Sequence, residues 1–386
     1  EDNLALINGG AVVNLGNAEM IDCTFEANKS DDLAGAVLNG LDAVLDIRDS
    51  KFIRNSARDC AAIFNHGRLT IEHTTFDSNS SGHDCGAIAN IDGYLEVKNS
   101  YFIKNSAERD GGAIINRART YILDCLFDGN TSKSYAGAIF TETGSSSLIS
   151  KGIFKNNSGA NGSAIFNTSE DTKISECQFN NNNAGLDLIY NKGNLQLLDS
   201  KFKDNFSKGL IVFNDVDSTM HITGGEMTKN ASNLSAIYNA GFCDISKFKF
   251  TDNSNRSSPS FELDIAGMHF DGDSADRMYS EDIYNVKQLS IKKIQLLSSQ
   301  KTVLNRGHID AFEFTQDEFD KHVHNLGTYK LHGITPHASF ADLDLMIHGQ
   351  NHLEIRLNED ILFNPVEQGF FEGGIELDVD GLVIDG

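Results

Sequence analysis

The sequence predicts an all-β protein built as a parallel β-helix, a solenoid in which coils of short strands stack on one another. Three observations predict this fold. Two short phrases recur about every 25 residues, period-2 alternation of apolar and polar residues lies between them, and no repeat leaves room for a crossover helix. A unit of this size cannot bury its own apolar face, so the repeats are expected to bury it by stacking.

The first phrase is Phe-x-x-Asn. Met227 replaces Phe in one copy, and Phe270 with Asp273 forms a weaker last copy. The clear copies are Phe25…Asn28, Phe52…Asn55, Phe76…Asn79, Phe102…Asn105, Phe127…Asn130, Phe154…Asn157, Phe179…Asn182, Phe202…Asn205 and Phe250…Asn253.

The second phrase is Gly-Ala-Ile/Val-x-Asn, in which several copies lack the Gly. Its first five Asn residues are separated by 25, 26, 25 and 26 positions, which is a strong repeat signal. These residues are Asn14, Asn39, Asn65, Asn90 and Asn116.

The segments between the phrases predict short strands separated by corners. Residues 69–71 and 95–97 alternate apolar and polar side chains, which is typical of half-buried strands. Asp49 and Asn99 follow such strands, and both residue types favour corners because they tolerate left-handed backbone. Each coil is therefore expected to hold about three strands.

Stacking places equivalent residues above one another, about 4.8 Å apart. We expect inward ladders of Phe, Ile, Leu and Ala, together with Asn ladders whose amides bond along the stack. About eleven coils would account for residues 1–275. Chain length then does not indicate the number of domains, because a solenoid grows along one axis.

The predicted domain organisation has three parts. Residues 1–314 form the β-helix, with regular coils to about 275 and degenerate coils after it. Residues 315–340 form a connector with a short helix, because Thr315 followed by Glu318 is a capping box. Residues 341–386 begin a second β-structured unit, and the sequence is interpreted as a fragment of a larger protein.

The composition argues against several classes of protein. There are 55 acidic and 32 basic side chains, so the formal charge is −23. This charge disfavours nucleic acids and anionic membranes as partners, because both require Lys and Arg. No run of about 18 apolar residues is present, so we expect no membrane insertion of this segment.

The pairing of the two phrases resembles two groups of surface proteins. The repeat at residues 85–106 is similar to those of adhesin-like proteins of methanogenic archaea. Residues 374–386 are similar to the sequence with which their β-helix units commonly begin. The two phrases also resemble the repeats of chlamydial polymorphic outer-membrane proteins. The resemblance implies an extracellular, cell-anchored, right-handed β-helix with an adhesive role.

The cysteines offer one candidate pair. Cys23, Cys125 and Cys177 lie two residues before a ladder Phe and are expected to be buried free thiols. Cys60 and Cys85 both lie five residues before a ladder Asn on consecutive coils. In-register stacking brings such residues within disulfide range, so the pair is either a structural disulfide or two stacked thiols.

Histidines and carboxylates are the remaining chemical candidates. The spacing of His322 and His324 would suit a metal site, but scattered surface histidines in a polar connector are the preferred interpretation. Asp22 and Asp49 share a corner on neighbouring coils, yet the same corner elsewhere holds His73, Asn99 or Lys151, so it is interpreted as solvated. Calcium is considered only at the acidic C-terminus, through Asp378, Asp380 and Asp385. The sequence thus assigns no catalytic, cofactor-binding or metal residues.

Two functions from different classes follow. The first is a monomeric, extracellular adhesin-like or stalk segment that binds glycans or the surface proteins of host or partner cells, because the coils are monotonous and lack long loops. The second is a polysaccharide lyase or glycoside hydrolase with a cleft in residues 256–350. Its candidate carboxylates are Asp264, Asp271, Asp273 and Asp276.

Overall fold

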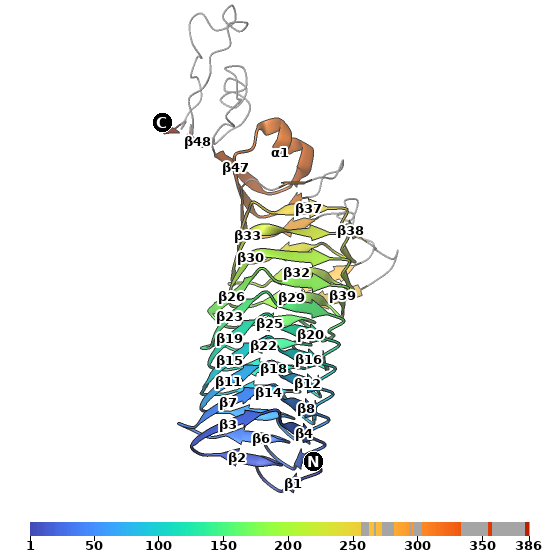
Figure 1. Cartoon of the computed structure of the whole chain (residues 1–386). Helices are drawn as coiled ribbons and strands as arrows, with labels where there is room; N and C mark the ends of the chain where they lie inside the picture. Colours follow the sequence, from blue (N-terminus) through green and yellow to red (C-terminus); the bar gives the residue numbers. More distant parts are fainter. Residues whose placement is uncertain are drawn as a thin grey trace, which may run out of the picture.

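The chain folds into an elongated right-handed parallel β-solenoid with about 25 residues per turn (Figure 1). The computed structural model describes residues 1–255, 262–265, 268–271, 282–292, 295–296, 303–332, 354–356 and 383–385. The fold class predicted from the sequence is therefore confirmed.

One sheet of thirteen strands is built from the Ala-Ile-x-Asn phrase. Each strand pairs in parallel with its copy on the next coil, and the phrase Asn residues pair with one another, as in Asn65↔Asn90. The strands are β2 (Val12–Asn14), β6 (Val37–Asn39), β10 (Ile63–Asn65), β14 (Ile88–Asn90), β18 (Ile114–Asn116), β22 (Ile139–Thr141), β25 (Ile165–Asn167), β29 (Asp187–Asn191), β32 (Leu210–Asn214), β35 (Ile237–Asn239), β41 (Ile283–Asn285), β44 (Val303–Asn305) and β46 (Val323–Asn325).

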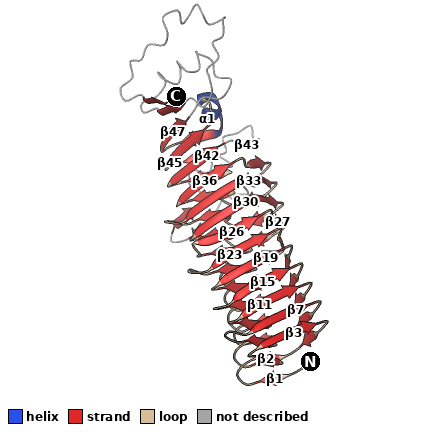
Figure 2. Ribbon diagram, turned by 60° about the vertical axis from the view of Figure 1, so that its left-hand side comes forward, coloured by secondary structure: helices blue, strands red, loops and turns tan. Residues whose placement is uncertain are grey.

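A second sheet of 22 strands contains two rows, which β30 and β33 join because each continues through both. The row of longer strands forms one continuous face in Figure 2. This long-strand row consists of β3 (Asn17–Ile21), β7 (Val44–Arg48), β11 (Arg68–Glu72), β15 (Tyr94–Lys98), β19 (Arg119–Leu123), β23 (Ser146–Ser150), β26 (Asp171–Ser175), β30 (Asn194–Lys203), β33 (Thr219–Thr228), β36 (Phe242–Ser246), β42 (Gln288–Lys292), β45 (His308–Phe312) and β47 (Thr328–His332).

The short-strand row carries the Phe of the Phe-x-x-Asn phrase. Its strands, besides the second halves of β30 and β33, are β4 (Thr24–Glu26), β8 (Lys51–Ile53), β12 (Thr75–Asp77), β16 (Tyr101–Ile103), β20 (Leu126–Asp128), β24 (Ile153–Lys155), β27 (Gln178–Asn180), β37 (Lys249–Thr251) and β43 (Gln295–Leu296).

Two-residue strands complete the coils in two further sheets. The first contains β1 (Leu4–Ala5), β5 (Lys29–Ser30), β9 (Ser56–Ala57), β13 (Ser80–Ser81), β17 (Ser106–Ala107) and β21 (Thr131–Ser132). The second contains β28 (Asn183–Ala184), β31 (Phe206–Ser207), β34 (Ala231–Ser232) and β38 (Ser254–Asn255).

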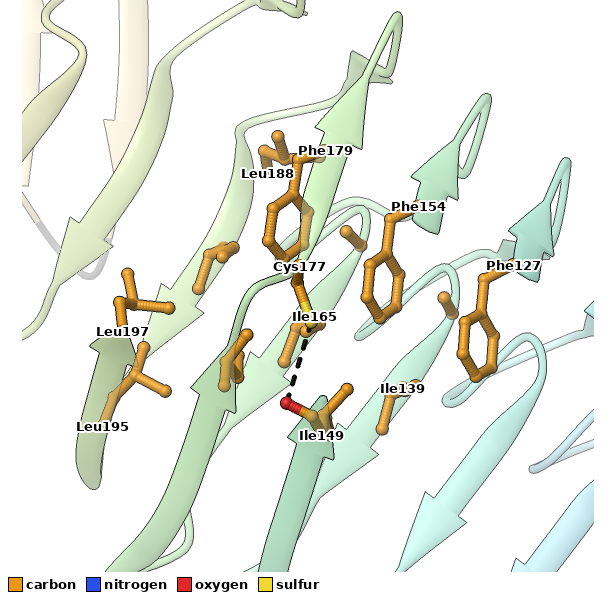
Figure 3. Packing of buried hydrophobic residues seen from close by; sticks show 14 of the residues in the cluster. Phe127, Ile139, Ile149, Phe154, Ile165, Cys177, Phe179, Leu188, Leu195 and Leu197 are labelled. Carbon is orange, nitrogen blue, oxygen red and sulfur yellow. Dashed lines mark hydrogen bonds between the residues drawn. The ribbon is translucent and has the colours of Figure 1, made fainter. Parts of the chain in front are cut away.

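The core is a set of columns that run along the solenoid axis. Figure 3 shows Phe127, Phe154 and Phe179 in a row on successive coils. Their ring centroids lie 4.9 and 4.8 Å apart, with interplanar angles of 4° and 10°. All three side chains are fully buried. Met227 fills its expected place in this column. The predicted Phe ladder is confirmed.

Two Asn ladders run beside these columns. In the first, Asn79 Nδ2 donates to the Phe52 carbonyl oxygen and to Asn105 Oδ1, both at 2.9 Å. In the second, Asn65 Nδ2 donates to Asn90 Oδ1 at 2.8 Å. The ladder amides therefore satisfy buried backbone groups as well as one another.

Burial of the first ladder also bears on glycosylation. Five of its Asn residues precede x-Ser or x-Thr and so match the acceptor pattern for glycans. Each is at most 1 % exposed, and the side-chain amide that would carry the glycan is held inside the coil: Asn28, Asn79, Asn130, Asn205 and Asn230.

Three left-handed bends shape each coil as far as Gly162, and the first two of them recur in the coils that follow. In the coil after β7 these are Asp49 at φ 50°, Arg54 at φ 52° and Cys60 at φ 57°. The corner at Asp49 is the Asp/Asn corner predicted from the sequence, and the equivalent residues His73 and Asn99 also have positive φ. Its residue types vary because the position selects for a backbone conformation on the surface rather than for a side-chain function.

The stack is interrupted once. Asn239 pairs directly with Asn285, so 46 residues separate two positions that are about 25 apart on the preceding coils and 20 apart on the two that follow. The weak last copy of the first phrase, predicted at Phe270, is not a coil: Phe270 lies on an antiparallel hairpin of β39 (Glu262–Ile265) and β40 (Met268–Asp271). Ten strands of the thirteen-stranded sheet precede this insertion, rather than the eleven coils expected by residue 275.

The end of the stack differs from the predicted connector at 315–340. The capping box is present, because Thr315 Oγ1 accepts from Glu318 N and helix α1 (Gln316–His322) begins there. However, β46 and β47 then add one more coil, since Asn325 continues the Asn ladder by accepting from Asn305 Nδ2 at 2.6 Å. Within the predicted unit at 341–386 only β48 (Glu354–Arg356) and β49 (Val383–Asp385) are described, and they pair in parallel.

Candidate functional site

The outer face of the long-strand row carries a cluster that we call the tyrosine platform: Arg68, Tyr94, Glu96 and Tyr121. These residues lie on β11, β15 and β19, where alternate side chains point inward to the core and outward to solvent. Both Tyr residues are partly exposed. The alternation is what brings their rings onto one flank of the solenoid.

The rings of the platform come from different register positions. Tyr94 pairs with Arg119, whereas Tyr121 pairs with Glu96 on the preceding coil. The two ring centroids lie 5.6 Å apart at an interplanar angle of 41°. The rings are therefore diagonal neighbours across two strands rather than members of a ladder.

Charged groups surround the rings. The Arg68 guanidinium lies 4.5 Å from the centroid of the Tyr94 ring, within cation–π range. Tyr94 donates from its hydroxyl to Glu96 Oε2 at 2.9 Å, and Glu96 also contacts the Lys98 ammonium. The Lys98 hydrogen bond lowers the pKa of Glu96, while burial and then the Glu96 hydrogen bond raise the pKa of Tyr94. At neutral pH the platform thus presents the neutral Tyr94 phenol beside the ionised Glu96 carboxylate.

A hollow of about 170 Å³ opens at the platform. Its walls are the outward side chains of β15, β19 and β23 together with core residues beneath them: Tyr94, Glu96, Val97, Lys98, Tyr121, Ile122, Leu123, Leu148 and Ser150. The hollow combines aromatic and apolar surface with the Glu96 carboxylate and the Lys98 ammonium, and it is smaller than a typical pocket for a drug-sized ligand.

A second depression, the polar groove, lies on the short-strand row. Its volume is about 560 Å³, within the range typical of ligand sites. Lys201 lies 3.6 Å from Glu226 across neighbouring coils. The groove is lined by Gln178, Asn180, Asn181, Lys201, Phe202, Lys203, Asp204, Glu226 and Thr228.

The structure brings the predicted cysteine pair together. Cys60 Sγ lies 3.1 Å from Cys85 Sγ, and both residues are 1 % exposed. Cys125 and Cys177 are buried thiols as predicted, and burial raises the pKa of each to about 12. Cys23 is only partly buried because it lies on the first coil.

The other predicted candidates form no site in the described residues. His322 ends α1 and His324 lies on β46, and the described part of the chain contains no group of three or more His, Cys, Asp or Glu suited to a metal. Asp273 and Asp276 lie outside the described residues, as do Asp378 and Asp380. The backbone at Asp264, Asp271 and Asp385 is described, but their side chains are not.

Two buried carboxylates that stand where other coils have a small residue were missed by the sequence analysis. Asp187 occupies the position of Gly112, where an added Cβ would lie 2.1 Å from the Gly137 carbonyl oxygen. Asp282 replaces the Ala before Ile and accepts from Asn253 Nδ2 at 2.9 Å, at the end of the first Asn ladder. Aligning the repeats would have revealed both, because each places an acid where other coils have a small residue.

Burial dominates the electrostatics of these two groups. It raises the pKa of Asp187 and of Asp282 to about 7 each, from an ordinary value of 3.8. Asp187 Oδ1 accepts from Gly162 N at 2.5 Å, which opposes the shift, and nearby Asp215 adds to it. Asp215 in turn accepts from the Tyr190 hydroxyl at 2.8 Å.

We expect Asp187→Asn to raise stability at pH 8 and to flatten its pH dependence. Between pH 4 and 7 the folded state keeps the Asp187 proton while the unfolded chain releases it, so the free energy of unfolding falls as pH rises through this window. The full penalty, on the order of a few kcal/mol, is present above pH 7. Urea unfolding at pH 5 and pH 8 measures it, with exposed Asp217→Asn as the control. An equal gain at both pH values would contradict the assignment.

The fold defines the class: this is a β-helix repeat protein whose interior is built from repeating ladders of side chains. The family model described as "Right handed beta helix region" matches residues 62–226, from β10 into β33. Searches of the curated proteins and of the solved structures found no match. A β-helix scaffold serves both adhesive and enzymatic roles, so the function must be argued from the surface. No helix in the described ranges has the length and apolar character needed to cross a bilayer.

Proposed function

We propose that this β-helix is an extracellular adhesin-like or stalk segment of a cell-surface protein, which binds glycans through the tyrosine platform. The observation that carries the proposal is the juxtaposition of the Tyr94 and Tyr121 rings with the Glu96 carboxylate on one outward face. A tyrosine ring offers an apolar face to sugar C–H groups, and a carboxylate accepts hydrogen bonds from sugar hydroxyls.

The scaffold supports this role in two ways. Backbone pairing on both sides of β15 and β19 holds the platform residues in register, so little conformational entropy is lost when a ligand binds. The polar groove on the adjoining row offers a second polar surface to a long glycan, and two weak contacts on one chain reinforce each other. The repeat's resemblance to surface adhesins and the charge of −23 agree with glycans or surface proteins, rather than polyanions, as partners.

Tyr94→Ala is expected to weaken glycan binding at least about tenfold, because it removes the ring and the partner of Glu96. A glycan array with the whole chain identifies ligands, and titration calorimetry then compares the wild type with the variant. Tyr101→Ala is the matched control, since Tyr101 is 49 % exposed on the short-strand row and lies outside the platform. Equal affinities for all three proteins, or an array with no bound glycan, would argue against the platform as the site.

A polysaccharide lyase or glycoside hydrolase is the second candidate, favoured by the presence of Asp204 and Glu226 in the polar groove. Glycosidases act through two carboxyl groups on opposite sides of the bond they cleave. The array ligands and acidic polysaccharides can be incubated with the protein and examined for new reducing ends or unsaturated products. Turnover that disappears in Glu226→Gln but persists in Tyr94→Ala would favour the enzyme over the adhesin.

A further inference from the structure

Two cysteines occupy the same left-handed bend on consecutive coils. Cys60 has φ 57° and Cys85 has φ 64°, and the equivalent residues on other coils are Gly9, Ala34, Gly111, Ala136 and Gly162. A side chain at this bend meets strong steric limits: a Cβ at Gly111 would lie 2.3 Å from Ile115 Cγ1. A left-handed conformation also costs about 1–2 kcal/mol for residues other than Gly. Two adjacent cysteines at such a position therefore call for an explanation.

The two sulfur atoms lie in a small apolar cluster with Ala89 and Ile115, against which Phe64 packs. The residue facing this bend is Ala89 on the coil of Cys85, where the next coil has the larger Ile115. Cys60 Sγ accepts from Ala89 N at 3.1 Å and lies 2.8 Å from the Ile63 carbonyl oxygen. Backbone bonds from Cys60 N to Asp84 O, at 2.9 Å, and from Ala61 N to Cys85 O, at 3.0 Å, hold the two bends one coil apart.

We propose that Cys60 and Cys85 form a disulfide that staples two neighbouring coils when the chain folds under oxidising conditions. Adjacent coils lie about 4.8 Å apart, within the Cα separation that a disulfide spans. The sulfur atoms, now 3.1 Å apart, need to approach by about 1 Å to reach bonding distance. The bond would close a loop of 25 residues.

The chemistry balances with a small-molecule disulfide as the oxidant. One cysteine thiolate attacks oxidised glutathione and releases one glutathione thiolate, which leaves a mixed disulfide on the protein. The second cysteine thiolate then attacks the protein sulfur and releases the second glutathione. Two electrons pass from the cysteines to the oxidant, and the two protons lost by the thiols are taken up by the two glutathione thiolates.

Burial of the two thiols determines when the disulfide can form. Both thiols are 1 % exposed, and burial raises the pKa of the Cys85 thiol well above its ordinary value. Because the thiolate is the reactive form, the folded protein reacts slowly, whereas the unfolded chain reacts readily. Once formed, the disulfide is buried and is therefore shielded from reductants. The staple is therefore expected to form during folding.

The test is to refold the full chain in a mixture of oxidised and reduced glutathione, and in reductant alone. After oxidative refolding we expect four of the six cysteines to label with a maleimide in denaturant, and peptide mapping to recover Cys60 joined to Cys85. The melting temperature should rise by several degrees relative to the reduced protein. Brief exposure of the reduced, folded protein to oxidised glutathione should leave all six thiols.

Two variants keep the result interpretable. Cys60→Ser should retain all five remaining thiols and show no melting-temperature gain under oxidation. Cys125→Ser should form the bond between Cys60 and Cys85 and gain melting temperature as the wild type does, because Cys125 lies in the core column away from the pair. Six free thiols in a protein that refolds with native β-sheet content, or a bond between other cysteines, would overturn the proposal. Glycan binding at the platform is measured separately and does not depend on this result.

Discussion

Replacing Asn105 by Ala is expected to lower the free energy of unfolding by about 3–5 kcal/mol, because it leaves several buried polar groups without partners. Asn105 Oδ1 accepts from both Asn79 N, at 3.1 Å, and Asn79 Nδ2, at 2.9 Å. Asn105 Nδ2 donates to the Phe76 carbonyl oxygen and to Asn130 Oδ1, both at 3.0 Å. The side chain is fully buried, so water cannot replace these bonds without opening the coil.

The control is Asn183→Ala, which removes an exposed amide on the two-residue strand β28 and should change stability by less than about 0.5 kcal/mol. Urea unfolding followed by circular dichroism gives the difference. Hydrogen exchange adds a local measurement, because a solenoid couples each coil mainly to its neighbours. Protection should fall at Asn79 and Asn130 and remain unchanged near Asn230. A cost below about 1 kcal/mol would show that the ladder is not a main source of stability.

Replacing Phe102 by Ala is expected to cost a similar amount, about 3–5 kcal/mol, for a different reason. The ring is fully buried and stacks between Phe76 and Phe127, with centroids 4.9 and 4.8 Å away and interplanar angles of 3° and 6°. Truncation leaves a cavity and removes both stacking contacts. The neighbouring coils cannot close the gap, because backbone hydrogen bonds on both sides fix the spacing of β16.

Tyr101→Ala is the matched control, since Tyr101 is adjacent on the same strand but points outward and is 49 % exposed. We expect it to change stability by about 0.5 kcal/mol or less. Phe102→Leu, which keeps most of the volume, should lie between the two. If the two Ala substitutions had equal effects, the inward and outward assignments on β16 would be wrong.

Much of the interior could be predicted because one physical rule repeats along the chain. A position that points inward on one coil points inward on all of them, so the Phe and Asn phrases were sufficient to place Phe102 and Asn105. The same rule placed Cys60 beside Cys85. The rule is weaker where the repeat is less regular. The sequence therefore predicted a coil at Phe270, where the structure has an insertion between β38 and β41. It also predicted a connector where β46 and β47 form a further coil.

The surface could not be predicted in the same way. Tyr94 and Tyr121 are 27 residues apart and belong to different register positions, so no repeat relates them. Their proximity results from the diagonal geometry of neighbouring strands. Asp187 was overlooked because an acidic residue is usually assumed to be exposed, and its burial is visible only when the coils are stacked.

For this protein, then, the amino-acid sequence was enough to establish a parallel β-helix, its coil length and its inward ladders. Those features depend on local periodicity, and each coil repeats the constraint. The tyrosine platform, the polar groove and the raised pKa of Asp187 are decided only by the folded structure. They depend on which side chains face one another between coils, and that contact is a property of the packed solenoid rather than of any single repeat.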